Sequence, residues 1–409
     1  MASYEIWQNA WKENVKNPLS ISLPDDWKVE YHHMKGDFWP ALTKEEIYEK
    51  ICNPIGSKTI RELASHGKDA IIVFDDLSRG TPVRPIAEIV VDELLAGGIG
   101  KDHIRFLCAL GNHAAHTRAD FVQKLGEEIV EQYPVFNHNP YENCVKVGVD
   151  SCGTDVRINR EFMECDVRIG IGSVTPHPMN GYGGGGKLLF PGIASIDTTC
   201  SNHLRKEFEP VGDKAPCGLR RDIEDMTKMI GQFFKIDALI NARLDMIGLF
   251  AGDPVAEYYE AIQLSAEANA MDMGEPKDVV IVNANAKYNE SSISTVIGNM
   301  ELKPGGDIVM VNHCPVGQVV HYVYGTFGKH FGGRCWVPHE KREGKKFRRI
   351  IYYTPYPEYM SKMAFDEPDK VIFARTWEDV LELLSGHGPG TTASILSDGT
   401  ISYFPSTLK

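Results

Sequence analysis

Three histidines, one arginine and one lysine stand where a chain often builds a ligand site. Lys187 directly follows a run of four glycines. His177 precedes Lys187 by ten residues, and His203 follows it by sixteen. Arg79 and His113 each lie in a polar loop directly after an apolar, strand-like stretch. Histidine exchanges protons near neutral pH and also binds metal ions, whereas arginine is suited to a carboxylate. These residue types indicate acid–base chemistry on an anionic substrate, beside a ligand held by the glycine loop.

The glycine-rich loop fits two well-known nucleotide patterns incompletely. Gly181 to Lys187 reads as G-x-x-x-x-G-K, but Leu188 stands where a P-loop needs Ser or Thr to hold magnesium. The same glycines read as G-x-G-x-x-G, yet Pro191 would break the long helix that a dinucleotide loop opens. Consecutive glycines still let the backbone lie against a ligand and offer N–H groups to a phosphate. A purely structural glycine turn is the remaining alternative.

The motifs around these residues resemble those of nickel-dependent lactate racemases. The strongest begins at Thr175-Pro-His-Pro178 and continues through the glycines to Lys187-Leu-Leu-Phe-Pro-Gly-Ile-Ala194, with Ser201-Asn-His203 behind it. The resemblance extends over about residues 70 to 315. Three shorter matches occur in the expected order: Asp75-Asp-Leu-Ser-Arg79, Leu110-Gly-Asn-His113 and Lys303-Pro-Gly-Gly306.

The resemblance implies a cofactor and a role for each residue. The cofactor is a nickel-pincer nucleotide, in which pyridinium-3,5-bisthiocarboxylic acid mononucleotide holds a nickel ion. Lys187 would carry it as a covalent thioamide, and His203 would be the protein ligand to nickel. His113 and His177 would be paired acid–base catalysts, and Arg79 would assist them by contacting the substrate. The other cofactor-binding residues would be Asp76, Gly183, Gly184, Gly185, Gly186, Tyr288 and Asn289.

The implied activity is racemisation or epimerisation of a 2-hydroxy acid by reversible hydride transfer. The α-proton of such an acid is weakly acidic, so a base would take the hydroxyl proton while the electrophilic cofactor takes the hydride. The planar keto acid can then accept hydride on its other face, and each hand of the substrate needs its own base. Two alternatives stay open: net oxidation with the same cofactor, and binding of the cofactor or a nucleotide without turnover.

The substrate end of the pocket departs from the family pattern. Lactate racemases carry a substrate-contacting lysine four residues after a tyrosine, whereas counting from Tyr288 reaches Ser292, and the expected glutamine is Asn289. Lys287 is adjacent, but we expect it to point elsewhere if the strand end is preserved. Ser292 thus has a small hydroxyl where the family pattern has a cation. We therefore expect Ser292 to contact a substrate other than lactate, such as a sugar acid or another polar 2-hydroxy acid.

Alternating strand-like and helix-like stretches must bring these residues together. Apolar strands are predicted at 70–74, 104–109 and 165–171, and each leads into one of the segments described above. Helical periodicity lies between them, at 86–95 and 121–130. Strand–helix–strand units imply a parallel sheet covered by helices, in which ligands bind at the carboxyl ends of the strands.

We therefore expect an α/β fold of two domains, each with a mostly parallel sheet flanked by helices and with the active site in the cleft between them. Residues 1–274 would form the N-terminal domain and carry the cofactor-anchoring loop and the catalytic histidines. Residues 275–392 would form a second α/β domain, beginning with a strand at 277–283, that closes over the site. Residues 393–409 would form a hairpin returning to the first domain.

Composition limits the partners. A net charge of −13 opposes binding to nucleic acid, and no apolar run is long enough to span a membrane. The nine cysteines are scattered without a C-x-x-C pair, which indicates reduced thiols. We expect a cytoplasmic enzyme whose partners are a small 2-hydroxy acid and the proteins that make the cofactor. The basic run at 341–349 is expected to be a solvated hairpin.

Overall fold

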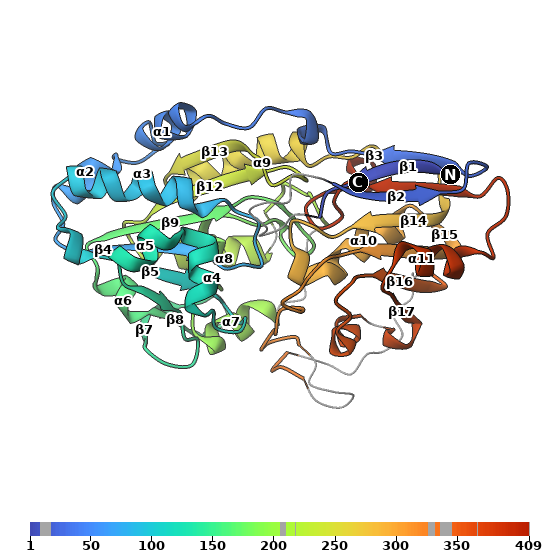
Figure 1. Cartoon of the computed structure of the whole chain (residues 1–409). Helices are drawn as coiled ribbons and strands as arrows, with labels where there is room; N and C mark the ends of the chain where they lie inside the picture. The colour runs from blue at the N-terminus through green and yellow to red at the C-terminus, as the bar shows by residue number, and fades with distance from the viewer. Residues whose placement is uncertain are drawn as a thin grey trace.

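A computed structural model of the chain has two six-stranded sheets, each flanked by helices (Figure 1). It describes residues 1–8, 18–204, 210–216, 218–325, 332–335, 346–365 and 367–408. The strand order is β13-β12-β9-β4-β5-β6 in the first sheet and β17-β16-β15-β14-β18-β3 in the second. Among the described residues, each pairing in these two sheets is parallel except β12 with β13. The predicted fold class is confirmed.

The first sheet positions the loops that the sequence singles out. Its central strands are apolar along their length because helices and loops cover both faces. The strands predicted at 70–74, 104–109 and 165–171 are present, with ends shifted by no more than two residues. The strands of this sheet are β4 (Ala70–Asp75), β5 (Ile104–Ala109), β6 (Val135–Asn137), β9 (Val167–Ser173), β12 (Phe234–Ile240) and β13 (Met246–Gly252).

Helices of the first half divide between the two faces of this sheet. One face packs against α1 to α5 around Phe74 and Phe106, and the other packs against α6, α8 and the segment that follows the glycine loop. The sequence predicts one helix over 121–130, but Gly126 adopts a φ of +86° and divides it into α4 and α5. These helices are α1 (Lys44–Cys52), α2 (Ile60–Ala64), α3 (Val83–Ala96), α4 (Arg118–Leu125), α5 (Glu127–Gln132), α6 (Arg160–Glu164), α7 (Ile196–His203), α8 (Gly218–Lys228) and α9 (Ala256–Ala268).

The second sheet has a similar layered construction. Its apolar strands pack on one side around Ile297 of α10 and on the other around Trp377 of α11, together with the hairpin of β1 (Ala2–Ile6) and β2 (Leu19–Leu23). The elements are β3 (Lys28–His32), β14 (Lys277–Asn283), α10 (Ser294–Met300), β15 (Leu302–Val311), β16 (Arg349–Tyr353), β17 (Val371–Ala374), α11 (Trp377–Leu384) and β18 (Thr392–Leu396).

The chain termini are placed differently from the prediction. The segment from residue 393 is expected as a hairpin on the first domain, but β18 lies in the second sheet, parallel to β14 and β3. β3 is therefore also part of the second sheet, although it falls within residues 1–274. Of the described C-terminal residues, Tyr403 reaches back, exchanging backbone hydrogen bonds with Asn269 and Met271. The apolar pattern of β18 cannot distinguish between two sheets that both bury apolar strands.

Two further expectations concern the surface. Most of the basic run at 341–349 lies outside the described residues, but Arg348 and Arg349 are described, and both pair with the buried carboxylate of Asp307. No helix in the described part of the chain is long and apolar enough to cross a bilayer.

Candidate active site

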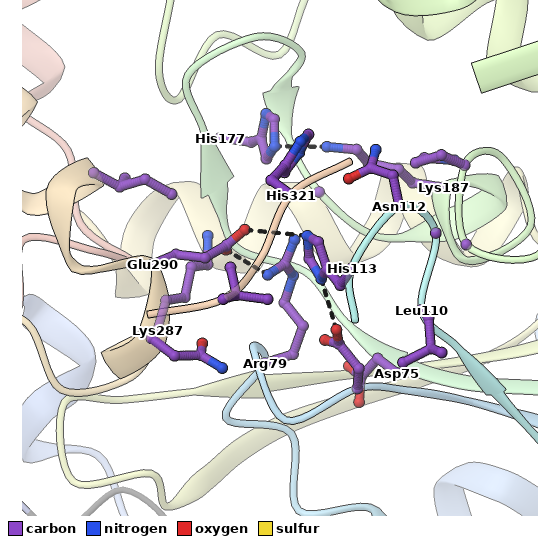
Figure 2. A pocket seen from close by; sticks show the side chains of 18 of the residues that line it. Asp75, Arg79, Leu110, Asn112, His113, His177, Lys187, Lys287, Glu290 and His321 are labelled. Atoms are coloured by element: carbon purple, nitrogen blue, oxygen red, sulfur yellow. Dashed lines mark hydrogen bonds and ion pairs between the residues drawn. The ribbon is translucent and has the colours of Figure 1, made fainter. Parts of the chain in front are cut away.

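One cavity of about 830 Å³ brings together residues from the ends of strands in both sheets. Its volume suits a ligand of ordinary cofactor or drug size. Figure 2 shows side chains from both halves of the chain converging on it. The predicted site residues that line it are Asp76, Arg79, His113, His177, Gly183, Gly184, Lys187, His203, Asn289 and Ser292. Three predicted cofactor-binding residues do not line it: Gly185, Gly186 and Tyr288.

Lys187 and His177 form the contact at one end of the cavity. Lys187 lies in the short 3-10 helix η3 (Gly185–Leu188), and His177 ends strand β10 (Pro176–His177), which pairs with β11 (Gly181–Tyr182). Lys187 Nζ is 2.6 Å from His177 Nε2. His177 Nδ1 accepts a hydrogen bond of 3.1 Å from the Met179 N–H, which assigns the ring proton to Nε2. Nε2–H then donates to the lysine nitrogen, which can accept only as a neutral amine.

The electrostatics of the cavity support the same protonation states. Burial, reinforced by the charge of Arg79, lowers the pKa of Lys187 well below its ordinary value. Burial, reinforced by Lys187 and Lys287, likewise lowers the pKa of His177 well below its ordinary value. Lys187 therefore presents an uncharged amine, which is the nucleophilic form of lysine.

The four glycines before Lys187 serve two different purposes. A Cβ on Gly184 would lie 2.3 Å, and one on Gly186 2.1 Å, from side-chain atoms beneath the loop, while Gly185 has a φ of +58°. Packing and backbone conformation therefore require glycine at those three positions. Gly183 differs, because a Cβ there would meet nothing closer than the Thr175 carbonyl oxygen at 3.6 Å. The free space beside Gly183 lies at the cavity, where a ligand can approach the backbone.

Buried charged side chains hold this loop from below. The Arg220 guanidinium donates to the carbonyl oxygens of Tyr182 and Gly184, at 2.9 and 3.2 Å. The Asp237 carboxylate accepts a hydrogen bond of 2.6 Å from the Gly185 N–H. These partners fix the backbone on both sides of Gly184.

His113 lies among carboxylates. Its Nδ1 is 2.6 Å from Asp76 Oδ2, and its Nε2 is 3.6 Å from Glu290 Oε1. Burial alone would lower the pKa of His113, but Asp76 outweighs burial and raises it above its ordinary value. Despite its own burial, the pKa of Asp76 is lowered, chiefly by His113. The resting pair is therefore an imidazolium and a carboxylate.

The loop that carries Asp76 and Arg79 follows β4 and is anchored by one buried lysine. Lys124 Nζ is 2.7 Å from Asp75 Oδ1 and donates to the carbonyl oxygens of Asp76 and Arg79, at 3.1 and 2.8 Å. The backbone N–H of Leu77 donates to His116 Nε2 at 3.0 Å. His116 thus has a structural role in this loop, and it does not line the cavity.

Arg79 forms an ion pair with Glu290, which belongs to the second half of the chain. Arg79 Nη1 is 2.6 Å from Glu290 Oε2 and 2.7 Å from Ser78 Oγ. Glu290 belongs to the 3-10 helix η4 (Tyr288–Ile293) and has non-helical dihedral angles, with φ −118° and ψ 39°. Figure 2 shows dashed lines from its carboxylate to both Arg79 and His113. Burial would raise the pKa of Glu290, but Arg79 and His113 lower it, so the side chain is ionised.

His203 ends α7 with one nitrogen available. Its Nδ1 lies 3.0 Å from the Thr199 carbonyl oxygen and can only donate to it, which leaves Nε2 unprotonated in the neutral ring. Burial and Lys187 lower the pKa of His203 to about 4, so the ring is neutral near pH 7. Within the described residues, no group of three or more histidine, cysteine or acidic side chains could hold a metal ion. A metal bound to His203 would need donors beyond those of the described residues.

Polar atoms in the cavity remain without partners. Asn112 Oδ1 and Asn289 Oδ1 are buried and have no hydrogen bond within the described chain. Leaving a buried amide oxygen unpaired costs free energy, and such atoms often mark a place where a ligand or water binds. Both side chains line the cavity.

Sequence comparisons relate the chain to lactate racemases. The family described as the lactate racemase N-terminal domain matches residues 15–211. A lactate racemase from Thermoanaerobacterium thermosaccharolyticum is 25% identical over 317 residues, which is 74% of each chain. One from Lactiplantibacillus plantarum is 28% identical over 282 residues, which is 66% of each chain. The match to the lactate racemase N-terminal domain thus covers just under half of this chain, and both relatives are lactate racemases. These relatives indicate an isomerase of the racemase type.

Solved structures match the fold. The lactate racemase apoprotein from Thermoanaerobacterium thermosaccharolyticum has a TM-score of 0.73 at 20% identity, and the match covers 98% of this chain and all of that one. A protein from Thermotoga maritima has a TM-score of 0.65 at 18% identity and covers 91% of this chain. The two-sheet architecture is therefore shared with the lactate racemase apoprotein.

The structure corrects one expectation and adds three residues. Lys287 was expected to point elsewhere, but it lines the cavity with its side chain buried. Glu290 and His321 also line it, and the ring centroids of His321 and His113 are 5.4 Å apart. Glu290 is one residue after the Asn289 singled out from the sequence. No local pattern marks His321, whose neighbour His113 is more than two hundred residues away in the sequence.

Proposed function

We propose that this protein racemises or epimerises a 2-hydroxy acid by reversible hydride transfer to a nickel-pincer nucleotide attached to Lys187. The observation that carries the proposal is the neutral Lys187 amine, held 2.6 Å from His177 Nε2 beside the open backbone of Gly183. An ammonium group in that place would have neither the lone pair for a covalent bond nor an acceptor for the histidine proton.

The residues of the cavity fit such a cofactor. Lys187 offers the amine for a thioamide, and Gly183 leaves space for a ligand against the backbone. His203 Nε2 is an unprotonated donor of the kind that nickel accepts, and the cavity provides no complete metal site of its own among the described residues. This agrees with a metal whose remaining donors belong to the nucleotide. The bound group would supply nickel and an electrophilic carbon that accepts and returns hydride.

The protein's own side chains would bind substrate and move its hydroxyl proton. His177 is neutral at rest and suited to take that proton, whereas His113 is protonated at rest and suited to give one. Arg79 is placed to contact the substrate next to His113. With both histidines on one cavity, each hand of substrate would have an acid–base group on its own side.

The substrate end of the cavity is polar. Asn289, Glu290 and Ser292 line it on η4, and Ser292 stands where a lysine is expected in lactate racemases. A site rich in hydrogen-bonding groups rejects a substrate that leaves them unpaired. We therefore propose a sugar acid or another polar 2-hydroxy acid in preference to lactate.

The first test is the mass of the protein isolated after production with the proteins that make the cofactor, which we propose as its partners in the cytoplasm. The Lys187 peptide should carry an adduct of a few hundred daltons, and Lys187→Ala should carry none. His203→Ala should keep the organic adduct but lose tightly bound nickel. Undiminished nickel in His203→Ala would show that the ligand is misassigned.

A second test separates racemisation from net oxidation. The loaded protein is incubated with one pure enantiomer and no electron acceptor, and the products are resolved on a chiral column. Racemisation should proceed to an equal mixture, because enantiomers have equal free energy. Accumulation of the keto acid only when an acceptor is supplied would establish oxidation instead.

A further inference from the structure

Lys287 is a cation buried at the cavity, and among the described residues the negative charges of Glu290 and Asp398 act on it only from beyond ion-pair distance. Its side chain lines the cavity, the residue is 2% exposed, and its ammonium makes no hydrogen bond or ion pair with the residues that the structure describes. Its backbone N–H donates to Thr400 Oγ1 at 3.1 Å, so the start of η4 is pinned. A buried, unpaired charge is costly and is usually compensated by a counter-ion. The cavity is thus built to receive an anion at Lys287.

Glu290, three residues after Lys287, adds a negative charge to the cavity. It occupies Arg79 with a 2.6 Å ion pair and lies 3.6 Å from His113, so the arginine charge is already balanced. The position of η4 is fixed, because Gln318 Oε1 accepts hydrogen bonds from both the N–H and the hydroxyl of Ser291, at 3.0 and 2.9 Å. The carboxylate of Glu290 faces the cavity, and within the described chain Arg79 is the only donor at hydrogen-bonding distance from it.

We propose that Lys287 binds the substrate carboxylate and that Glu290 accepts a hydrogen bond from a hydroxyl group further along the same molecule. The pocket then selects 2-hydroxy acids that carry at least one more hydroxyl, and it rejects those with a second carboxylate. This inference rests on the proposed function, since it assigns the two ends of that substrate to residues. It also replaces Ser292 with Lys287 and Glu290 as the main determinants of specificity.

The charges decide between candidate substrates. A monocarboxylate gives Lys287 the ion pair that it lacks among the described residues, whereas a dicarboxylate would place its second anion against Glu290, where like charges repel. A 2-hydroxy acid with a methyl group at the far end would cover Glu290 without giving it a hydrogen bond. An added hydroxyl satisfies Glu290, and hydrogen bonds to charged groups are among the stronger ones in proteins.

The test compares three acids that differ at one position. The loaded protein is assayed with lactate, glycerate and malate, which carry a hydrogen, a hydroxyl and a carboxylate on the third carbon. We expect kcat/KM for glycerate to exceed that for lactate by about tenfold or more, with malate the poorest. Equal turnover of lactate and glycerate overturns the inference and leaves the proposed function standing. No turnover of any 2-hydroxy acid would overturn the proposed function and the inference with it.

Glu290→Gln tests the carboxylate itself. This variant keeps the shape and one acceptor oxygen but removes the charge, so malate should gain about tenfold or more in kcat/KM relative to glycerate. The ratio between two substrates is the readout because a general loss of packing would lower both together. Glu88→Gln, which removes an exposed carboxylate paired with Arg84 on α3, should leave the ratio unchanged. An unchanged ratio in Glu290→Gln contradicts the assignment.

Lys287→Met identifies which anion the lysine binds. If the anion is the substrate carboxylate, KM should rise about ten- to a hundredfold while the adduct on the Lys187 peptide stays complete. If the anion is the phosphate of the nucleotide, the adduct should be lost and the KM of the remaining enzyme should not change, which overturns the proposal. Lys228→Met, on the exposed face of α8, is the matched control and should affect neither.

Discussion

The two histidines of the cavity lie in opposite electrostatic surroundings. His113 follows β5 and faces the carboxylates of Asp76 and Glu290, whereas His177 lies on the β10–β11 hairpin and faces Lys187 and Lys287. The pKa of His113 is raised and that of His177 is lowered. Residues of the same type thus begin a reaction cycle in different protonation states. A racemase that works on both hands of a substrate needs one acid and one base at any moment, and this asymmetry provides them.

The largest expected effect follows from removing either histidine. His113→Gln and His177→Gln should each lower kcat/KM by about a hundredfold or more, the usual contribution of a general acid or base. The loss should be equal in the two directions, because the equilibrium constant between enantiomers is one and no catalyst changes it. Initial rates from each pure enantiomer provide the measurement. A variant that keeps near-normal rates would exclude that histidine from catalysis.

Removing the carboxylate that holds His113 should change the pH dependence. Activity requires His113 protonated and His177 neutral, so it falls as pH rises through the raised pKa of His113 and as pH falls through the lowered pKa of His177. Asp76→Asn removes the partner that raises the pKa of His113. The alkaline limb of the pH profile of kcat/KM should therefore shift to lower pH by about one to three units. A limb that stays in place would mean that another group titrates there.

The buried charge of Lys287 should lower the free energy of unfolding, and replacing the lysine should reveal this cost. Burial, with Arg79, lowers its pKa from 10.5 to about 8, so holding the proton opposes folding at neutral pH at a cost on the order of 3 kcal/mol. Lys287→Met should raise the free energy of unfolding by an amount of that order at pH 7. The gain should shrink as pH rises from about 8 to 10.5, because the native lysine then loses its charge. Denaturant titrations at pH 7 and pH 10 check this, and an unchanged or lower stability at pH 7 would contradict it.

The smallest effect is expected at His116, the histidine near His113 that does not line the cavity. His116→Gln should lower stability by about 1 kcal/mol through loss of its hydrogen bond with the Leu77 N–H, and it should leave kcat nearly unchanged. Comparing kcat of this variant with kcat of His113→Gln separates the loss of a catalytic group from the loss of a structural hydrogen bond. A loss of kcat similar to that of His113→Gln would show that this distinction is wrong.

The sequence predicts local features well where one segment contains all the evidence. β5 and β14 begin and end at the predicted residues, and the short η3 helix agrees with the rejection of a nucleotide loop at Gly181 to Lys187. Arg79 and His113 share one cavity because strand ends of a parallel sheet meet at one edge. His177, Lys187 and His203 reach the same cavity from the β10–β11 hairpin, η3 and α7.

Features that depend on contacts between distant segments were not predictable. The direction of Lys287 follows from the pinning of η4 by Gln318 and Thr400, and neither contact has a sequence signal. The pairing of Glu290 with Arg79 spans 211 positions of the chain. The sheet to which β18 belongs likewise depends on contacts between segments that are far apart in the sequence. A pKa shift is equally non-local, which is why two histidines that look alike in the sequence differ in charge.

The most direct test of this asymmetry is a nuclear magnetic resonance titration of protein labelled with ¹⁵N only in histidine. The His113→Gln and His177→Gln variants assign the two signals. At pH 7 we predict that the His113 ring is protonated on both nitrogens and that the His177 ring is neutral, with its proton on Nε2. Both rings titrating together near the ordinary histidine pKa of about 6.5 would contradict the account.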